Sequence, residues 1–215
     1  MNRLFNGEGK SFTFDVRGNG YGRGEGVGMV MLKRLDDAIR DRDEIRAVIR
    51  SSGANSDGKT NGITLPNQAA QERLARSLFR GLEFGPSDVE YAEAHGTGTK
   101  AGDAAEIAAI RNVFCQKRDA KQPLFVGTAK PNIGHSEAVS GAAGLIKTVM
   151  AMEKGLIPPN ILLENYKPGL EPEKWNMKLT LIYELKGYVI DTDCVFTRLP
   201  DPLPLGSPLR LPERP

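Results

Sequence analysis

Cysteine is scarce in this sequence of 215 residues, which contains only Cys115 and Cys194. Two cysteines cannot form the framework of several disulfides that stabilises small secreted domains, and their spacing excludes a Cys-x-x-Cys metal site. The chain also has only two histidines, with no nearby cysteine or carboxylate at the spacing of zinc ligands. We therefore expect neither a disulfide framework nor a bound metal ion.

Long apolar runs and an excess of one charge are missing as well. The first eleven residues are polar and lack the apolar core of a signal peptide, and Lys147 and Glu153 interrupt the most apolar helical segment. The chain has 29 Lys and Arg residues against 27 Asp and Glu residues. Basic residues around 40–50 alternate with acidic ones, which is typical of a solvated face. We expect a cytoplasmic protein with neither a membrane nor a nucleic acid as partner.

Between residues 45 and 179, strand-like and helix-like apolar patterns alternate, which predicts an α/β fold. The expected strands are 45–50, 89–94 and 124–128, and the expected helices are 68–81, 103–114 and 136–154.

Three further segments have a distinct character. An apolar run at 27–32 predicts a strand, and a β-like stretch at 181–190 precedes a proline-dense end. Ser136 is expected to cap the long helix. That helix contains Gly141 and Gly144, each costing about 1 kcal/mol relative to alanine, so we expect its backbone to lie very close to a neighbour.

Glycine occupies every second position from Gly18 to Gly28. The alternation never forms Gly-x-Gly-x-x-Gly, and a strand pattern follows it, so no helix N-terminus would face a phosphate. We therefore reject nucleotide binding. The glycines are expected to let the chain pass near an active site, with Arg23 and Glu25 pairing within the run.

Each histidine directly follows an expected strand. His95 opens the loop 95–99 (HGTGT), and His135 ends the loop 130–135 (KPNIGH). Ligands of open α/β sheets bind beyond the carboxyl ends of strands, and small neighbours allow a substrate to approach closely. A single histidine is more often structural than catalytic, but this pairing predicts one shared pocket. There, two imidazole N–H groups can stabilise an oxyanion or an enolate.

Two charged residues flank His135. Lys130 can hold a carboxylate or bias a histidine, and the alternative is a surface lysine at a strand end. Glu137 is expected to cap the dipole of the following helix, with a bond to one histidine as the alternative.

These motifs resemble those of β-ketoacyl synthases (ketosynthases) of polyketide and fatty-acid synthases. Residues 93–99 (EAHGTGT) and 130–135 (KPNIGH) are similar to the family's two histidine motifs, and residues 136–137 to those of fungal iterative polyketide synthases. Other segments follow in the family's order, so the resemblance covers about residues 11–179. These segments are 12–26, 45–58, 144–147 (GLIK) and 157–160 (IPPN).

The resemblance implies a partial thiolase-like α/β fold. Residues 11–44 would form the end of the N-terminal ketosynthase half, and residues 45–179 a truncated C-terminal half. Residues 180–215 would form a divergent, proline-rich and disordered tail. The implied reaction is decarboxylative Claisen condensation in polyketide or fatty-acid biosynthesis, with acyl groups carried on the phosphopantetheine of an acyl carrier protein. The resemblance implies no directly bound cofactor, and a homodimer for the complete family member.

The resemblance also implies roles for individual residues. His95 and His135 would assist decarboxylation and hold thioester oxygens, and Lys130 would support them through Glu137 or a nearby carboxylate. Further substrate-binding or supporting residues would be Thr97, Thr99, Asn132 and Glu137.

The sequence departs from the family in one important respect. The family's nucleophilic cysteine lies in a Cys-Ser-Ser segment that has no counterpart here, and neither Cys115 nor Cys194 has that context. Ala104 also replaces the usual proline after 102–103. One hypothesis is a ketosynthase fragment that arises from truncation or gene prediction. The second is a non-catalytic remnant that pairs with a complete ketosynthase. The third and weakest treats 212–215 (PERP) as a ligand of proline-binding modules.

Overall fold

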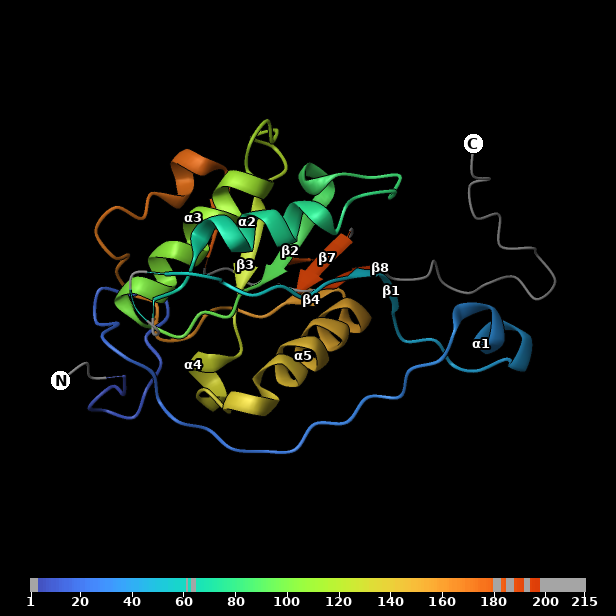
Figure 1. Ribbon diagram of the computed structural model, residues 1–215, viewed down its shortest axis with the longest axis horizontal. Helices are drawn as coiled ribbons and strands as arrows, with labels where there is room; N and C mark the ends of the chain where they lie inside the picture. The colour runs from blue at the N-terminus through green and yellow to red at the C-terminus, as the bar shows by residue number, and fades with distance from the viewer. Residues whose placement is uncertain are drawn as a thin grey trace.

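The computed structural model describes residues 4–60, 62 and 65–179, together with the backbone of three later strands (Figure 1). Its centre is a six-stranded sheet with the order β1-β8-β7-β2-β3-β5. β3 and β7 flank β2 in parallel, and β5 is parallel to β3, whereas β8 is antiparallel to both β7 and β1. The strands are β1 (Val48–Ser52), β2 (Val89–Glu93), β3 (Leu124–Gly127), β5 (Met177–Lys178), β7 (Tyr188–Asp191) and β8 (Cys194–Thr197).

Helices cover both faces of this sheet. Helices α2 (Gln68–Ser77) and α3 (Lys100–Phe114) lie on one face, and α5 (Ser140–Lys154) lies on the other (Figure 1). On β3, Leu124 and Val126 pack into the core on the side of α3, and Phe125 packs into the smaller core on the side of α5. β3 is buried along its whole length for this reason, as is usual for a parallel strand between two helical layers.

Local sequence signals explain several helix ends. The side chains of Asn67 and Thr99 accept backbone N–H groups at the starts of α2 and α3, and Gly155 ends α5 in the left-handed conformation. The remaining elements are α1 (Leu35–Asp41), α4 (Lys130–Ile133), the 3-10 helices Pro86–Asp88, Glu137–Val139 and Pro172–Trp175, and the small sheet of β4 (Leu156–Ile157) with β6 (Tyr183–Glu184).

The α/β pattern expected between residues 45 and 179 is confirmed, with differences in detail. The strand expected at 45–50 is β1, shifted to Val48–Ser52. The long helix begins at Ser140 after a 3-10 turn, and Ser136 makes no capping hydrogen bond, so its predicted capping role is wrong. A Cβ at Gly141 would meet no atom of the described residues within 4 Å, so the expected close contact is absent at that position.

Residues 180–215 also differ from the expectation of a disordered tail. Strands β6, β7 and β8 lie within this segment, and β7 and β8 insert between β1 and β2 of the main sheet. The proline-dense part that follows, including 212–215, lies outside the described residues.

Two classes of site have no candidate in the described part of the chain. No helix there is long and apolar enough to cross a membrane. No group of three or more His, Cys, Asp or Glu side chains there is arranged to hold a metal ion.

Candidate active site

The two histidines meet at the carboxyl ends of β2 and β3. Only Ala94 separates His95 from the end of β2, and His135 lies beyond β3 and the short helix α4. Their ring centroids are 4.9 Å apart and the ring planes are inclined by 87°. The predicted convergence of the two loops is therefore confirmed, because neighbouring parallel strands end at the same edge of the sheet.

The glycine run passes directly beside His135. The N–H of Gly24 donates to the carbonyl of His135 at 3.0 Å, and the N–H of His135 donates to the carbonyl of Gly22 at 2.7 Å. A Cβ on Gly24 would lie 2.2 Å from the carbonyl oxygen of Ile133, so only glycine fits there. As the sequence predicted, the glycines let the chain pass close to the candidate site. The predicted pair of Arg23 with Glu25 is wrong, because Arg23 pairs with Glu137 at 3.0 Å.

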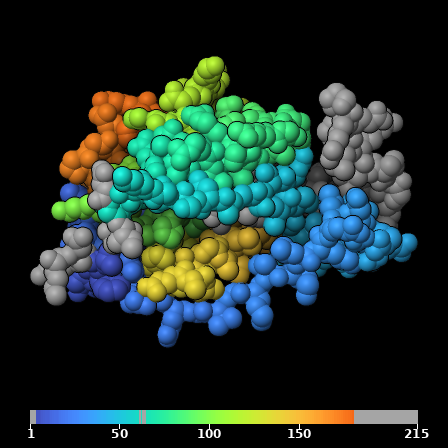
Figure 2. Space-filling view, viewed as in Figure 1, coloured from blue at the N-terminus to red at the C-terminus, as the bar shows by residue number. Residues whose placement is uncertain are grey.

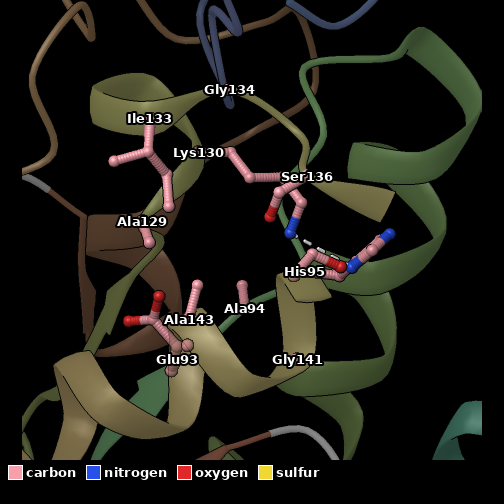
Figure 3. Close-up of a pocket in the computed structure, with 12 residues that line it drawn as sticks. Glu93, Ala94, His95, Ala129, Lys130, Ile133, Gly134, Ser136, Gly141 and Ala143 are labelled. Atoms are coloured by element: carbon pink, nitrogen blue, oxygen red, sulfur yellow. Dashed lines mark hydrogen bonds between the residues drawn. The ribbon is translucent and has the colours of Figure 1, made fainter. Parts of the chain in front are cut away.

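Lys130 is buried at the start of α4, with 5% of its surface exposed, so the surface-lysine alternative is wrong. Its Nζ lies 3.2 Å from Nδ1 of His95 (Figure 3). A lysine ammonium group has hydrogens to donate and no acceptor, so Nδ1 of His95 is the acceptor. The ring proton of His95 is then on Nε2.

The ring of His135 is held in the same way by a different donor. The backbone N–H of Glu137 donates to Nδ1 of His135 at 3.1 Å, which again leaves the proton on Nε2. Glu137 adopts a left-handed backbone conformation with φ of 48° and lies three residues before α5. The expected capping of α5 by its carboxylate is therefore wrong, because that carboxylate pairs with Arg23.

Both histidines are neutral at physiological pH. Although His95 keeps exposed surface, burial of its ring among protein atoms, together with the charges of Lys130 and His135, lowers its pKa to about 3. Burial and the charge of Lys130 also lower the pKa of His135, against an opposing contribution from Glu137. Two neutral Nε2–H donors result.

Two buried carboxylates on α3 hold the loop that carries His95. Glu106 accepts the backbone N–H groups of His95 and Gly96 at 2.6 and 2.8 Å. Asp103 accepts the N–H groups of Phe14 and Gly98 at 2.8 and 2.9 Å, and it also accepts a hydrogen bond from Lys167. Burial raises the pKa of Glu106 to about 7.

Sequence reasoning missed Asp103 and Glu106. Their signal is two carboxylates one helical turn apart, on the side of α3 that also carries buried Ile107 and Ile110. Acidic side chains are rarely buried unless something bonds them, so their position on an apolar face indicates a bonding role.

A second missed group lies behind the pocket, on the side of α5. Lys147 of α5 donates to Glu93 at 2.7 Å and to the hydroxyl of Tyr91 at 3.0 Å, and Tyr91 also donates to Glu93. Glu93 and Tyr91 are 2% and 0% exposed. This buried cluster connects β2, which leads to His95, with the helix that follows His135.

A narrow cavity of about 30 Å³ opens beside His95 (Figure 3). Its walls include Glu93, Lys130 and several small residues of the α5 region, among them Gly141, Ala143 and Gly144. The small side chains of α5 therefore leave space next to the histidine.

The other predicted site residues lie in two different places. The hydroxyls of Thr97 and Thr99 are 3.0 Å apart, and that of Thr99 caps α3 by accepting the N–H of Gly102. Asn132 is exposed on α4 and lines a wide groove outside the histidine cavity. The structure thus groups His95, Lys130, His135 and Glu137, and it separates Asn132 from them.

Two family models match the sequence. The β-ketoacyl synthase C-terminal domain matches residues 46–164, and the β-ketoacyl synthase N-terminal domain matches residues 1–38.

Curated relatives include fungal polyketide synthases. The highly reducing polyketide synthase sdnO of Sordaria araneosa is 52% identical over 176 residues, covering 82% of this chain and 6% of that protein. The squalestatin tetraketide synthase of a Phoma species is 54% identical over 158 residues, covering 74% of this chain and 6% of that protein. The chain spans only a small part of these relatives.

Solved ketosynthase structures share the fold. The ketosynthase from module 6 of the bacillaene synthase of Bacillus subtilis 168 matches with a TM-score of 0.82 and 33% identity, over 90% of this chain and 37% of that one. The ketosynthase from module 1 of the bacillaene synthase of Bacillus amyloliquefaciens FZB42 matches with a TM-score of 0.86 and 31% identity, over 93% and 38% of the two chains. The chain therefore belongs to the β-ketoacyl synthase family, as part of a thiolase-like ketosynthase domain of the polyketide synthase type.

Proposed function

We propose that this chain supplies the histidine side of a ketosynthase active site, where a malonyl thioester loses carbon dioxide during polyketide chain extension. One observation carries the proposal. Nδ1 of His95 and Nδ1 of His135 each accept a hydrogen bond, from Lys130 and from the backbone of Glu137. Two neutral Nε2–H donors therefore lie in rings only 4.9 Å apart.

Such donors match the charge that develops during decarboxylation. The bond between the malonyl carboxylate and the α-carbon breaks, carbon dioxide leaves, and the electron pair moves into an enolate whose oxygen carries the negative charge. The Nε2–H groups of His95 and His135 would donate to this oxygen. Preorganised donors of this kind typically contribute about 10²–10³-fold each to the rate.

Lys130 would act on His95 and not on the substrate. Its ammonium group holds the Nε2–H tautomer by donating to Nδ1, and its charge disfavours protonation of the ring. A neutral imidazole can thus donate without taking up a proton from solvent. Asp103 and Glu106 would keep the His95 loop in place as positioning residues.

In a complete ketosynthase, the α-carbon of the enolate would attack an acyl thioester on a nucleophilic cysteine, and the cysteine thiolate would leave. Cys115 does not fit this role, because burial raises the pKa of its thiol to about 11. We propose that a residue outside this chain supplies the nucleophile. In this chain alone, a proton from water would quench the enolate and yield an acetyl thioester.

The relatives are polyketide synthases by name, which supports an acyl carrier protein as the partner. Its phosphopantetheine arm would deliver the malonyl group, so we propose no directly bound cofactor. For the complete domain we also propose a homodimer that acts in the cytoplasm.

The proposal is tested by mixing the chain with malonyl-carrier protein and measuring carbon dioxide release. We expect release above that of the carrier alone, and a fall of about 10²-fold or more in His95→Ala and in His135→Ala. The exposed Lys121→Ala variant is the matched control and should retain the wild-type rate. Equal release by wild type and both histidine variants would contradict the proposal, as would no release by the wild-type chain.

A further inference from the structure

Three side chains between β2 and α5 form a closed ring of hydrogen bonds. They are Tyr91, Glu93 and Lys147, here called the β2–α5 cluster. Lys147 donates to the Glu93 carboxylate at 2.7 Å and to the Tyr91 hydroxyl at 3.0 Å, and Tyr91 also donates to Glu93. The side chains of Lys147 and Glu93 are 19% and 2% exposed, and Tyr91 is fully buried. Each of the three groups is thus bonded to the other two inside the protein.

Stability alone does not account for charged groups at this position. Tyr91 packs with Phe125, Met152 and Ile157 in the smaller core, so the cluster lies in an apolar layer. Burying a charge costs free energy that its partner must offset, and a buried ion pair is often no more stabilising than apolar side chains of similar volume. What the cluster adds is direction, because a fully bonded polar network fixes one arrangement of the elements that it joins.

The cluster joins the two elements that lie next to the histidines. Only Ala94 separates Glu93, the last residue of β2, from His95, and α5 begins at Ser140, shortly after His135. Glu93 and His95 border the same narrow cavity (Figure 3). A movement of α5 relative to β2 would therefore change the separation of the two imidazole rings.

Apolar packing beside the cavity specifies this separation only weakly. The residues of α5 that border the cavity include Gly141, Ala143 and Gly144. Such small residues offer few atoms for contact, and each contact between two atoms contributes little attraction. The hydrogen bonds of the β2–α5 cluster supply the directional link that this packing lacks.

The outer side of α5 lies at the surface of the molecule (Figure 2). The segment 27–32 passes along the helix, where a Cβ on Gly28 would lie 3.0 Å from Ala142. This segment forms no strand, so the strand expected there from the sequence is wrong. The position of α5 therefore depends mainly on the side that faces the sheet, where the cluster lies.

We propose that the β2–α5 cluster is a positioning group that sets the separation of the His95 and His135 rings, so that both Nε2–H groups reach one substrate oxygen. The ring centroids are 4.9 Å apart. Oxyanion donors act at about 2.7–3.1 Å from the oxygen, and a misplacement of about 1 Å can lower the rate about 10²-fold. The effect on the rate rests on the proposed function, whereas the effect on the ring separation does not.

The first test uses Lys147→Met and Glu93→Leu, which remove opposite ends of the ion pair. We expect kcat for carbon dioxide release from malonyl-carrier protein to fall at least about tenfold in each variant, because the two donors no longer converge. Nuclear Overhauser effects between the ring protons of His95 and His135 should weaken in the same proteins. Glu93→Gln is the conservative counterpart, because its amide oxygen still accepts from Lys147 and Tyr91, so it should keep the ring contact and a kcat within about threefold of wild type.

A triple variant separates positioning from stability. Tyr91→Phe, Glu93→Leu and Lys147→Met together remove all three polar groups, so the urea unfolding midpoint should return to the wild-type value or exceed it. The directional bonds are still missing, so the weak ring contact and a kcat at least about tenfold below wild type should remain. Recovery of ring contact and rate together with stability would overturn the proposal, because any well-packed layer would then serve equally.

Met152→Ala is the opposite control. Met152 lies on α5 in the same apolar layer and is 1% exposed, so its truncation should lower the unfolding midpoint by opening a cavity. The cluster stays intact, so the ring contact and kcat should match the wild type. A loss of ring contact equal to that in Lys147→Met would show that general loosening of the layer is responsible, and it would also overturn the proposal.

The positioning proposal and the proposed function fail by different results. A wild-type chain that releases no carbon dioxide would reject the proposed function and leave the measurement of ring contact to decide on positioning. Unchanged ring contact in the triple variant would overturn the positioning proposal, whatever the rates are.

Discussion

The ammonium group of Lys130 lies 3.2 Å from Nδ1 of His95, although both groups carry or can acquire positive charge. The contact is favourable only while the imidazole is neutral, because a protonated ring has no acceptor. Lys130 thus fixes the tautomer of His95, and its charge adds to the desolvation that keeps the ring neutral. Its burial at the start of α4 keeps this effect from being screened by water.

Replacing Lys130 by methionine should raise the pKa of His95 above its value of about 3. The charge of Lys130 disappears, but desolvation, the larger cause, remains, so we expect the pKa to stay below 6.5. NMR titration of the His95 ring measures this change, with the exposed Lys121→Met as control. A pKa that does not move in Lys130→Met would show that the lysine does not act on this ring.

Neutralising Arg23 and neutralising Glu137 should change the pKa of His135 in opposite directions. Glu137 raises the pKa of His135 and Arg23 lowers it, so Glu137→Gln should lower that pKa and Arg23→Gln should raise it. Both side chains are about half exposed, so each variant should change stability by no more than about 1 kcal/mol. NMR titration of His135 and urea unfolding measure the two effects. Shifts in the same direction would contradict this account.

Gly24→Ala should destabilise the chain by about 1–3 kcal/mol, the usual cost of overpacking a close contact. The new Cβ would lie 2.2 Å from the carbonyl oxygen of Ile133, in the loop that ends at His135. Gly26→Ala is the matched control, because a Cβ there meets nothing within 4 Å, and it should change stability by less than about 0.5 kcal/mol. Equal unfolding midpoints in urea for the two variants would contradict the packing described for the glycine run.

Lys167→Met should destabilise the chain by about 3–5 kcal/mol, because it leaves Asp103 buried without its charged partner. The two side chains are only 12% and 1% exposed. Lys174→Met breaks an exposed pair with Glu171 and should cost at most about 1 kcal/mol. Urea unfolding of the two variants compares them directly, and a similar loss in both would argue against a structural role of the buried pair.

Glu106 should make the stability of the chain decrease as pH rises from about 4.5 through 7. Its pKa is raised from 4.5 to about 7 in the folded state, so the folded chain holds more protons in this range. His95 acts in the opposite sense, because its pKa is depressed and its contribution is lost as pH falls from 6.5 towards 3. Glu106→Gln should therefore be less destabilising, relative to wild type, at pH 8 than at pH 5.

Urea unfolding of both proteins at these two pH values tests the effect of Glu106, and the exposed Glu44→Gln variant serves as control. A difference between wild type and Glu106→Gln that is the same at pH 5 and pH 8 would show that Glu106 does not take up a proton on folding.

The sequence by itself determined much of the local structure and the family. Apolar spacing placed β2, β3, α2 and most of α3 and α5 to within a few residues, because each presents one regular face to a core. Two histidines after two strands also predicted their meeting, since neighbouring parallel strands end at one edge. The motifs around His95 and His135 identified the ketosynthase family that the comparisons confirm.

Only the tertiary structure decided which groups act on which. Neither the contact of Lys130 with His95 nor the bonds from Glu106 to the His95 loop can be read from spacing, because they join elements that pack only after the chain folds. The start of α5 moved from Ser136 to Ser140 for a similar reason. There the backbone N–H of Glu137 bonds His135, and its carboxylate bonds Arg23 from a segment more than a hundred residues earlier. Local propensity does not record bonds between distant segments, and at this site such bonds fix the tautomer of His95 and hold the loop that carries it.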